Sequence, residues 1–113
     1  MKTARLHFLS GRKRLYVQPA QIIRLEAMSN YTRVYFTDHA PVLMAKVLRL
    51  YDEILRPYGF LRIHKSHLVN TQHVITIDSN KMLHMMDASR VEITRSKKRE
   101  VLAQMDQLSH SKS

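Results

Sequence analysis

Histidine, lysine and serine side chains gather in one short stretch, His64-Lys-Ser-His67, and these residue types bind metals, transfer protons or act as nucleophiles. Three-residue spacing on a strand or loop does not bring two imidazoles together, and no carboxylate lies between Phe60 and Ile77 to orient them. Ser66 has no glycine-flanked elbow and no acidic partner nearby, as a hydrolase would require. We therefore expect no catalytic residue and no metal site.

Other signatures of enzymes and cofactor sites are missing from the sequence. The chain has two glycines, Gly11 and Gly59, which are too few and too far apart for a phosphate-binding loop. It has no cysteine, which excludes disulfides, thiolate zinc sites and a cysteine nucleophile. We expect a binding protein with no cofactor and no small-molecule substrate.

The overall charge favours a polyanionic partner. The 113 residues include 19 Lys and Arg against 9 Asp and Glu, which gives a formal net charge of +10. So large a charge on so small a chain makes a nucleic acid or an anionic membrane surface the leading partner class.

The length predicts a single domain over residues 1–113. No apolar run approaches the length of a membrane span or a signal peptide, so we expect a cytoplasmic protein.

The basic residues fall into three groups. No acidic residue precedes Glu26, and none occurs between Phe60 and Ile77. A third group follows close to the C-terminus. Single charge runs are usually solvated faces, but three acid-poor groups favour a binding surface. The first and third groups comprise Lys2, Arg5, Arg12, Lys13, Arg14 and Arg24, and then Arg95, Lys97, Lys98 and Arg99.

Hydrophobic periodicity predicts a mainly β fold with one central helix and one C-terminal helix. Apolar residues recur at three- and four-residue intervals over 46–56, where Pro57 and Gly59 end the helix, and again over 96–108. Between 64 and 74 we expect a short connection that presents His64, Lys65, Ser66, His67 and Asn70. Period-2 alternation predicts a strand over 61–64. Short apolar, β-branched and aromatic runs between turn signals predict further strands over 4–9, 15–17, 22–27, 31–36, 42–45, 74–77, 82–86 and 90–93, with a basic hairpin tip at 11–14.

Four blocks of the sequence resemble the LytTR DNA-binding domain of bacterial transcription regulators, from about Leu15 to Met105. The most specific block has the pattern aromatic-x-Arg-x-His-x-Ser-x-x-Val-Asn. The resemblance implies elongated antiparallel β-sheets of short strands, with loops that enter two successive major grooves of direct repeats on bent promoter DNA. The blocks are Leu25-Glu-Ala-Met-Ser-Asn-Tyr-Thr-Arg-Val34, Ile54-Leu55, Phe60-Leu-Arg-Ile-His-Lys-Ser-His-Leu-Val-Asn70 and Val91-Glu-Ile-Thr-Arg95.

The resemblance also assigns DNA contacts to particular residues of this chain. It puts Thr32 at a base-contacting position and Lys65 at a position that reaches into the groove. Arg95 has the chemistry to read guanine through O6 and N7, while Lys97 and Lys98 contact phosphates. The complete set of expected contacts is Asn30, Tyr31, Thr32, Arg33, His64, Lys65, Ser66, Arg95, Lys97 and Lys98.

Several of these residues have a structural alternative. Asn70 is a residue that often closes a turn, and that role is favoured here. His64 is as readily a packed imidazole on the sheet as a phosphate contact. Tyr31 and Tyr35 fit a sheet face or core better than a stacking platform, because duplex recognition does not need exposed bases.

The partners and the regulation stay open at the level of sequence. Double-stranded DNA is the expected partner, with a second copy on adjacent repeats and a membrane or sensor protein as a regulator. Members of the family usually carry an N-terminal receiver or membrane segment, so this chain is either a freestanding regulator or part of something longer. The alternatives are a small basic RNA- or ribosome-associated protein, and a module that holds an acidic or membrane-bound partner inactive.

Overall fold

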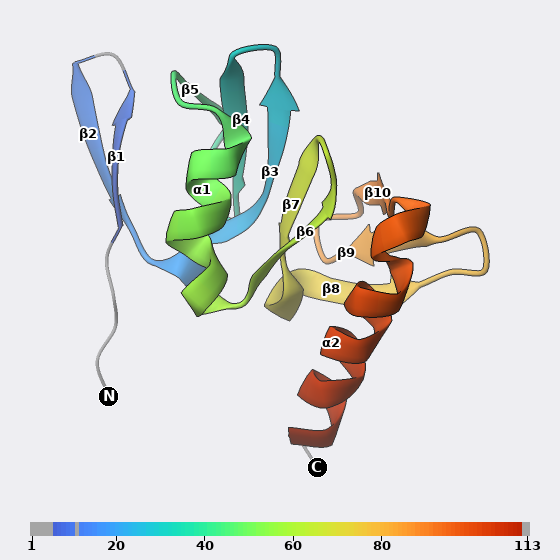
Figure 1. Cartoon of the computed structure of the whole chain (residues 1–113). Coiled ribbons are helices and arrows are strands. Elements are labelled where there is room, and N and C mark those ends of the chain that lie inside the picture. Colours follow the sequence, from blue (N-terminus) through green and yellow to red (C-terminus); the bar gives the residue numbers. More distant parts are fainter. Residues whose placement is uncertain (1–5, 11, 112–113) are drawn as a thin grey trace.

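A computed structural model describes residues 6–10 and 12–111, which form three antiparallel sheets and two α-helices (Figure 1). The predicted strand start at Ala4 and the glycine at the first hairpin tip, Gly11, lie outside these residues. The mainly β fold with a central and a C-terminal helix is confirmed. The strands are β1 (Leu6–Ser10), β2 (Lys13–Val17), β3 (Ile22–Met28), β4 (Tyr31–Phe36), β5 (Val42–Met44), β6 (Phe60–His64), β7 (His67–Asn70), β8 (Val74–Ile77), β9 (Met82–Met85) and β10 (Arg90–Glu92).

A five-stranded sheet of order β5-β4-β3-β7-β6 occupies the centre of the molecule. Consecutive residues of a strand point to opposite faces, so neighbours such as Ile22 and Ile23 enter different cores. One core lies between this sheet, the helix α1 (Leu48–Leu55) and the β1–β2 hairpin. The other lies between the sheet, the three strands β10-β9-β8 and the helix α2 (Lys98–Ser111). Both cores therefore depend on the same central strands.

The prediction of a short polar connection between residues 64 and 74 is wrong. Residues His67–Asn70 form β7, which pairs with β6 on one side and with β3 on the other. Leu68 and Val69 are both buried, one in each core, so the strand lacks the alternation that marks a half-buried strand. Only Lys65 and Ser66 remain as the tip of the β6–β7 hairpin.

Both helices were predicted, with small differences at their ends. α1 begins at Leu48 because Val47 has an extended backbone and serves as the N-cap residue. Leu48 and Leu55 are buried, whereas Val47 and Ile54 are 40% and 44% exposed. The chain then turns at Gly59, whose φ of 88° is in the left-handed region that favours glycine.

α2 starts at Lys98, after a 3₁₀ turn η4 (Arg95–Lys97), and continues to Ser111 rather than ending at 108. Val101 is its fully buried anchor, and Met105 packs beside it. Leu102, expected on the same face, is 37% exposed, and the side chain of Leu108 lies outside those described. Neither helix of the described chain has the length and apolar character of a membrane span.

Candidate nucleic-acid interface

Several hairpin tips lie along one edge of the molecule, at the top of Figure 1. The β1–β2, β3–β4 and β6–β7 tips all point this way, and α2 begins toward the same side. A backbone hydrogen bond from Ala27 N–H to Ser66 O, 2.9 Å long, joins the second and third of these tips. Thr94 N–H donates to Ile63 O at 2.8 Å, which fixes the start of η4 against β6. We call this row of tips the tip edge.

The β3–β4 tip presents Asn30 and Tyr31, but it does not present Thr32. Asn30 is exposed and Tyr31 is 48% exposed, next to a left-handed Ser29 with φ of 58°. Thr32 is completely buried, and its hydroxyl donates a 2.7 Å hydrogen bond to Lys46 O just before α1. Thr32 therefore does not reach the surface in this structure, and its expected base contact stays a prediction. Arg33 is half-buried on the following strand position.

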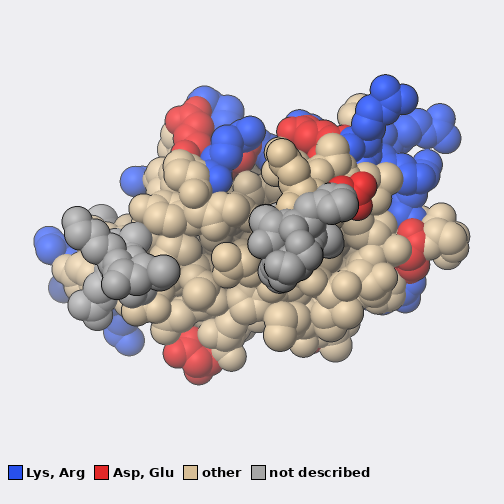
Figure 2. Space-filling model, turned by 90° about the horizontal axis from the view of Figure 1, so that it is seen from below, with Lys and Arg blue, Asp and Glu red and all other residues tan. Residues whose placement is uncertain are grey.

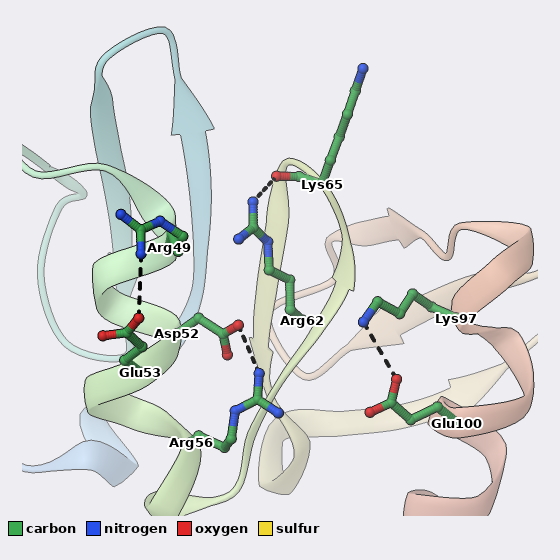
Figure 3. A network of polar contacts seen from close by, with 8 residues as sticks. All are labelled: Arg49, Asp52, Glu53, Arg56, Arg62, Lys65, Lys97 and Glu100. Atoms are coloured by element: carbon green, nitrogen blue, oxygen red, sulfur yellow. Dashed lines mark hydrogen bonds and ion pairs between the residues drawn. The ribbon is translucent and has the colours of Figure 1, made fainter.

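The β6–β7 tip is fixed by two hydrogen bonds within the hairpin. Arg62 Nη2 donates to Lys65 O at 2.5 Å, and Ser66 N–H donates to His64 Nδ1 at 3.0 Å. The second bond makes His64 Nδ1 an acceptor, so a neutral His64 carries its proton on Nε2, where it can serve as a donor. The Lys65 side chain is exposed and extends away from the hairpin (Figure 3). The hairpin therefore presents an ammonium group on a fixed backbone.

His67 begins β7 directly beside this tip, with its ring centroid 5.1 Å from that of His64. Burial lowers the pKa of His67, and the nearby Glu26 opposes that shift, while His64 and Arg24 add to it. Its Nδ1 is buried without a hydrogen-bond partner among the described residues. Burial at this position thus favours the neutral form of His67.

The third predicted segment is the 3₁₀ turn before α2. Arg95 is exposed, and no ion pair involves its guanidinium within the described chain. Lys97 is half-buried, and its Nζ lies 3.5 Å from Glu100 Oε1 (Figure 3). Lys98 is half-buried as the first residue of α2. Among these residues, Arg95 is the most available for an outside partner.

A cleft of about 560 Å³ separates the β6–β7 tip from η4 and reaches α1. One acidic residue, Asp52, faces it and is only 8% exposed. Its Oδ2 accepts a 2.8 Å hydrogen bond from Arg56, which stabilises the buried carboxylate (Figure 3). Most of the remaining lining is basic or polar, which suits a phosphate group. The lining consists of Asp52, Arg62, His64, Lys65, Thr94, Ser96 and Lys97.

The end of the molecule opposite the tip edge has a different character. Figure 2 looks onto that end, and the described residues there show Lys and Arg gathered at the rim rather than across the middle. Over the described residues of this face, basic side chains form no continuous patch across the middle.

Comparison with known proteins identifies the family and the fold of this chain. The family model of the LytTr DNA-binding domain matches residues 12–106. The chain belongs to the LytTR DNA-binding domain family. A solved structure of the LytTr DNA-binding domain of a putative methyl-accepting/DNA response regulator from Bacillus cereus superposes with a TM-score of 0.75. The two chains are 21% identical over 93% of this chain and 98% of the other, so this likeness shows a shared fold. A search of curated proteins gave no match.

Membership in the LytTR family makes this chain a DNA-binding domain of a non-enzymatic family. In the described residues, His, Cys, Asp and Glu side chains do not form a group of three or more that would hold a metal ion. What the fold offers instead is the tip edge, where segments far apart in the sequence meet.

Two residues whose alternatives were open have structural roles. Asn70 is buried, and its Nδ2 donates to Pro19 O at 3.2 Å and to Ile22 O at 3.0 Å. Its Oδ1 accepts from Gln72 N–H at 3.0 Å, so the expected turn-closing role is confirmed. Tyr35 lies on the sheet face, where its hydroxyl donates to Glu26 and the Arg24 guanidinium covers its ring at 3.8 Å.

Sequence analysis missed Arg62 as a residue of this site. The side chain lines the cleft and holds the Lys65 carbonyl, so it shapes the tip that carries the predicted groove contact. A signal was available, because Arg62 is the fixed arginine of the aromatic-x-Arg-x-His block and stands three residues before Lys65. A three-residue separation across the start of a tight hairpin allows a side chain to reach the turn backbone.

Proposed function

We propose that this chain is a sequence-specific double-stranded DNA-binding transcriptional regulator of the bacterial cytoplasm. Its hairpin tips enter successive major grooves of direct repeats in promoter DNA, and a second copy occupies the adjacent repeat. The observation that carries this proposal is the tip edge. Two backbone hydrogen bonds, Ala27 to Ser66 and Thr94 to Ile63, link the three segments that the family resemblance names. A duplex laid along the edge meets all three segments.

The proposed DNA contacts divide into readers, which contact bases, and anchors, which contact phosphates. Arg95 reads guanine, because a guanidinium offers paired donors that match O6 and N7. Lys65 reaches into the groove from the fixed β6–β7 tip, and Asn30 supplies a base-edge amide at the β3–β4 tip, which also carries Thr32. The residues that hold the phosphates are Tyr31, Arg33, His64, Ser66, Lys97 and Lys98.

The first experiment separates reading from anchoring. Arg95→Ala should cost about 1–3 kcal/mol on the preferred site and flatten discrimination at one base position. Lys98→Ala should weaken all sequences similarly and lower the salt slope by about one unit. Binding by both variants would be measured on a set of singly substituted operators, after selection of the preferred site from a random library. Equal and uniform losses in both variants would show a basic face without base reading.

A second measurement addresses the electrostatics of the whole complex. If about five to eight phosphates are neutralised, log K should fall against log salt with a slope near −0.9 per phosphate. A slope near zero would refute the electrostatic basis of the proposal.

A small RNA-binding protein is the second candidate, and exposed aromatic rings favour it. Tyr16 is 55% exposed and Tyr31 is 48% exposed, and exposed rings are what single-stranded bases stack on. Competition by single-stranded RNA against the selected duplex discriminates between the two functions. Stronger binding to the RNA than to the duplex would favour this candidate.

A further inference from the structure

The β1–β2 hairpin carries a basic tip that lies outside the proposed reading segments, which are the β3–β4 tip, the β6–β7 tip and η4. Ser10 pairs with Lys13 as the last rung of the hairpin, so Arg12 belongs to the turn itself. Arg12, Lys13 and Arg14 are all exposed. No acidic residue occurs in the sequence before Glu26, and within the described residues no ion pair involves these three side chains. Arg12 in the turn and Lys13 and Arg14 at the start of β2 therefore have no ion-pair partner in the part of the chain that the structure describes.

The position of this tip is fixed by the body of the hairpin. Phe8 and Val17 are each only 4% exposed and belong to the core beneath α1 and the five-stranded sheet. Leu6 and Leu15 pack against the same core. The Phe8 ring lies 5.5 Å from the Tyr51 ring of α1, which ties the hairpin to the helix. The basic tip is therefore held in a definite place relative to the reading segments.

That place is one end of the tip edge. In Figure 1 the β1–β2 tip points the same way as the β3–β4 and β6–β7 tips, and it stands beyond β5 at the outer end of the row. A duplex that runs along the reading segments continues past β5 toward this hairpin. Its backbone there offers phosphates, and lysine and arginine contact phosphates without regard to base sequence.

We propose that the tip formed by Arg12, Lys13 and Arg14 is a clamp for the phosphate backbone of DNA that flanks the recognition site on one side. This clamp rests on the proposed function, since it extends the same bound duplex. An acidic protein surface would also suit three cations, but the shared direction of the tips favours the polyanion already bound at the edge. The clamp adds affinity without adding sequence preference, and it acts on one flank only because the hairpin lies at one end of the row.

The test uses the whole chain and a family of duplexes built on its selected site. One duplex ends at the site, and two others extend it by about one helical turn on either side. For the unaltered chain, extension on one flank should tighten binding at least tenfold, and extension on the other flank should change it less. The favoured extension should also steepen the salt slope by about two to three contacts at 0.9 each.

The variant Arg12→Gln/Lys13→Gln/Arg14→Gln should lose this gain on the favoured flank and bind the short duplex as the unaltered chain does. Arg90→Gln is the control, because Arg90 is an exposed residue of β10 at the other end of the molecule, and it should keep the gain. The circular dichroism spectrum should be unchanged in both variants, since only exposed side chains are altered.

Three results would each overturn the clamp: an equal gain in affinity from extension on either flank, an equal loss of affinity on all duplexes in the triple variant, or no effect of the triple change. Failure of the unaltered chain to bind any duplex would overturn the proposed function instead.

Discussion

Asn70 illustrates how a residue of the family pattern serves the fold rather than the DNA. Its amide joins the end of β7 to the backbone before and within β3, through the carbonyls of Pro19 and Ile22. These groups are more than forty residues away in sequence, so the bonds help to hold β7 in register with β3. These two strands lead to the β6–β7 and β3–β4 tips. A polar side chain with 1% exposure is stable only when its hydrogen bonds are made.

Asn70→Ala should lower the free energy of unfolding by about 2–4 kcal/mol, because three backbone groups lose a partner in a largely buried place. Urea unfolding followed by circular dichroism measures the change. Gln72→Ala is the matched control, since Gln72 is exposed and only its backbone N–H takes part. That control should shift stability by less than about 0.5 kcal/mol. A similar loss in both variants would show that the Asn70 bonds contribute little.

At the residue scale, the turn-closing role of Asn70 could be predicted from the sequence, whereas the burial of Thr32 could not. Asparagine near the end of a strand has a short-range chemistry that points to a turn, and this could be predicted locally. The hydroxyl of buried Thr32 donates a hydrogen bond to the carbonyl of Lys46, which lies fourteen residues later in the sequence. The local sequence around Thr32 does not reveal this contact. A matched motif gives a position along the chain, but burial is decided by which element docks over that position.

At the scale of elements, the β6–β7 hairpin combines an exposed basic tip with a half-buried histidine. Burial holds the pKa of His67 below its ordinary value of 6.5, and the charges of His64 and Arg24 act in the same direction. Glu26 and Glu92 partly oppose this shift. The folded chain therefore binds the His67 proton less readily than the unfolded chain does.

Because the unfolded state takes up this proton first, the free energy of unfolding should fall as the pH drops below about 6.5. The loss ends once the pH is below the lowered pKa of the folded state. His67→Phe keeps an aromatic ring in the sheet and should flatten the dependence between about pH 7.5 and pH 5.5. Urea unfolding at several pH values in this window measures both proteins. An unchanged pH dependence in His67→Phe would assign the effect to another group.

The elements that sequence analysis found and the one it missed differ in burial. β6 alternates Leu61 and Ile63 with polar residues, and α1 has one apolar face, so their periods of two and about four are visible in the sequence. β7 has Leu68 in one core and Val69 in the other, and four such residues carry no period. Its identity as a strand depends on β3 and β6 on either side, which are known only once the sheet is assembled.

At the scale of the whole molecule, a single sheet supports two cores and one edge of tips. Because β3 and β7 contribute to both cores, a change in either core should disturb the placement of the tips. The charge follows the same organisation. The formal net charge of +10 favours association with a polyanion, and the backbone hydrogen bonds between the tips fix their spacing along the edge.

The size of the molecule limits how closely two copies can bind on one face of a duplex. Its two larger dimensions are 42 and 37 Å, and the row of tips runs across the width of the molecule in Figure 1. Repeats about 10 base pairs apart lie on one face with centres only about 34 Å apart, so two copies would overlap. Repeats about 21 base pairs apart keep the same face and leave room for both.

We therefore expect two bound copies at the wider spacing, and strongly weakened binding of the second copy at the narrower one, when stoichiometry is measured by analytical ultracentrifugation. A duplex with one repeat scrambled is the control and should bind one copy at either spacing. Equal double occupancy at both spacings would mean that the row of tips runs across the duplex rather than along it.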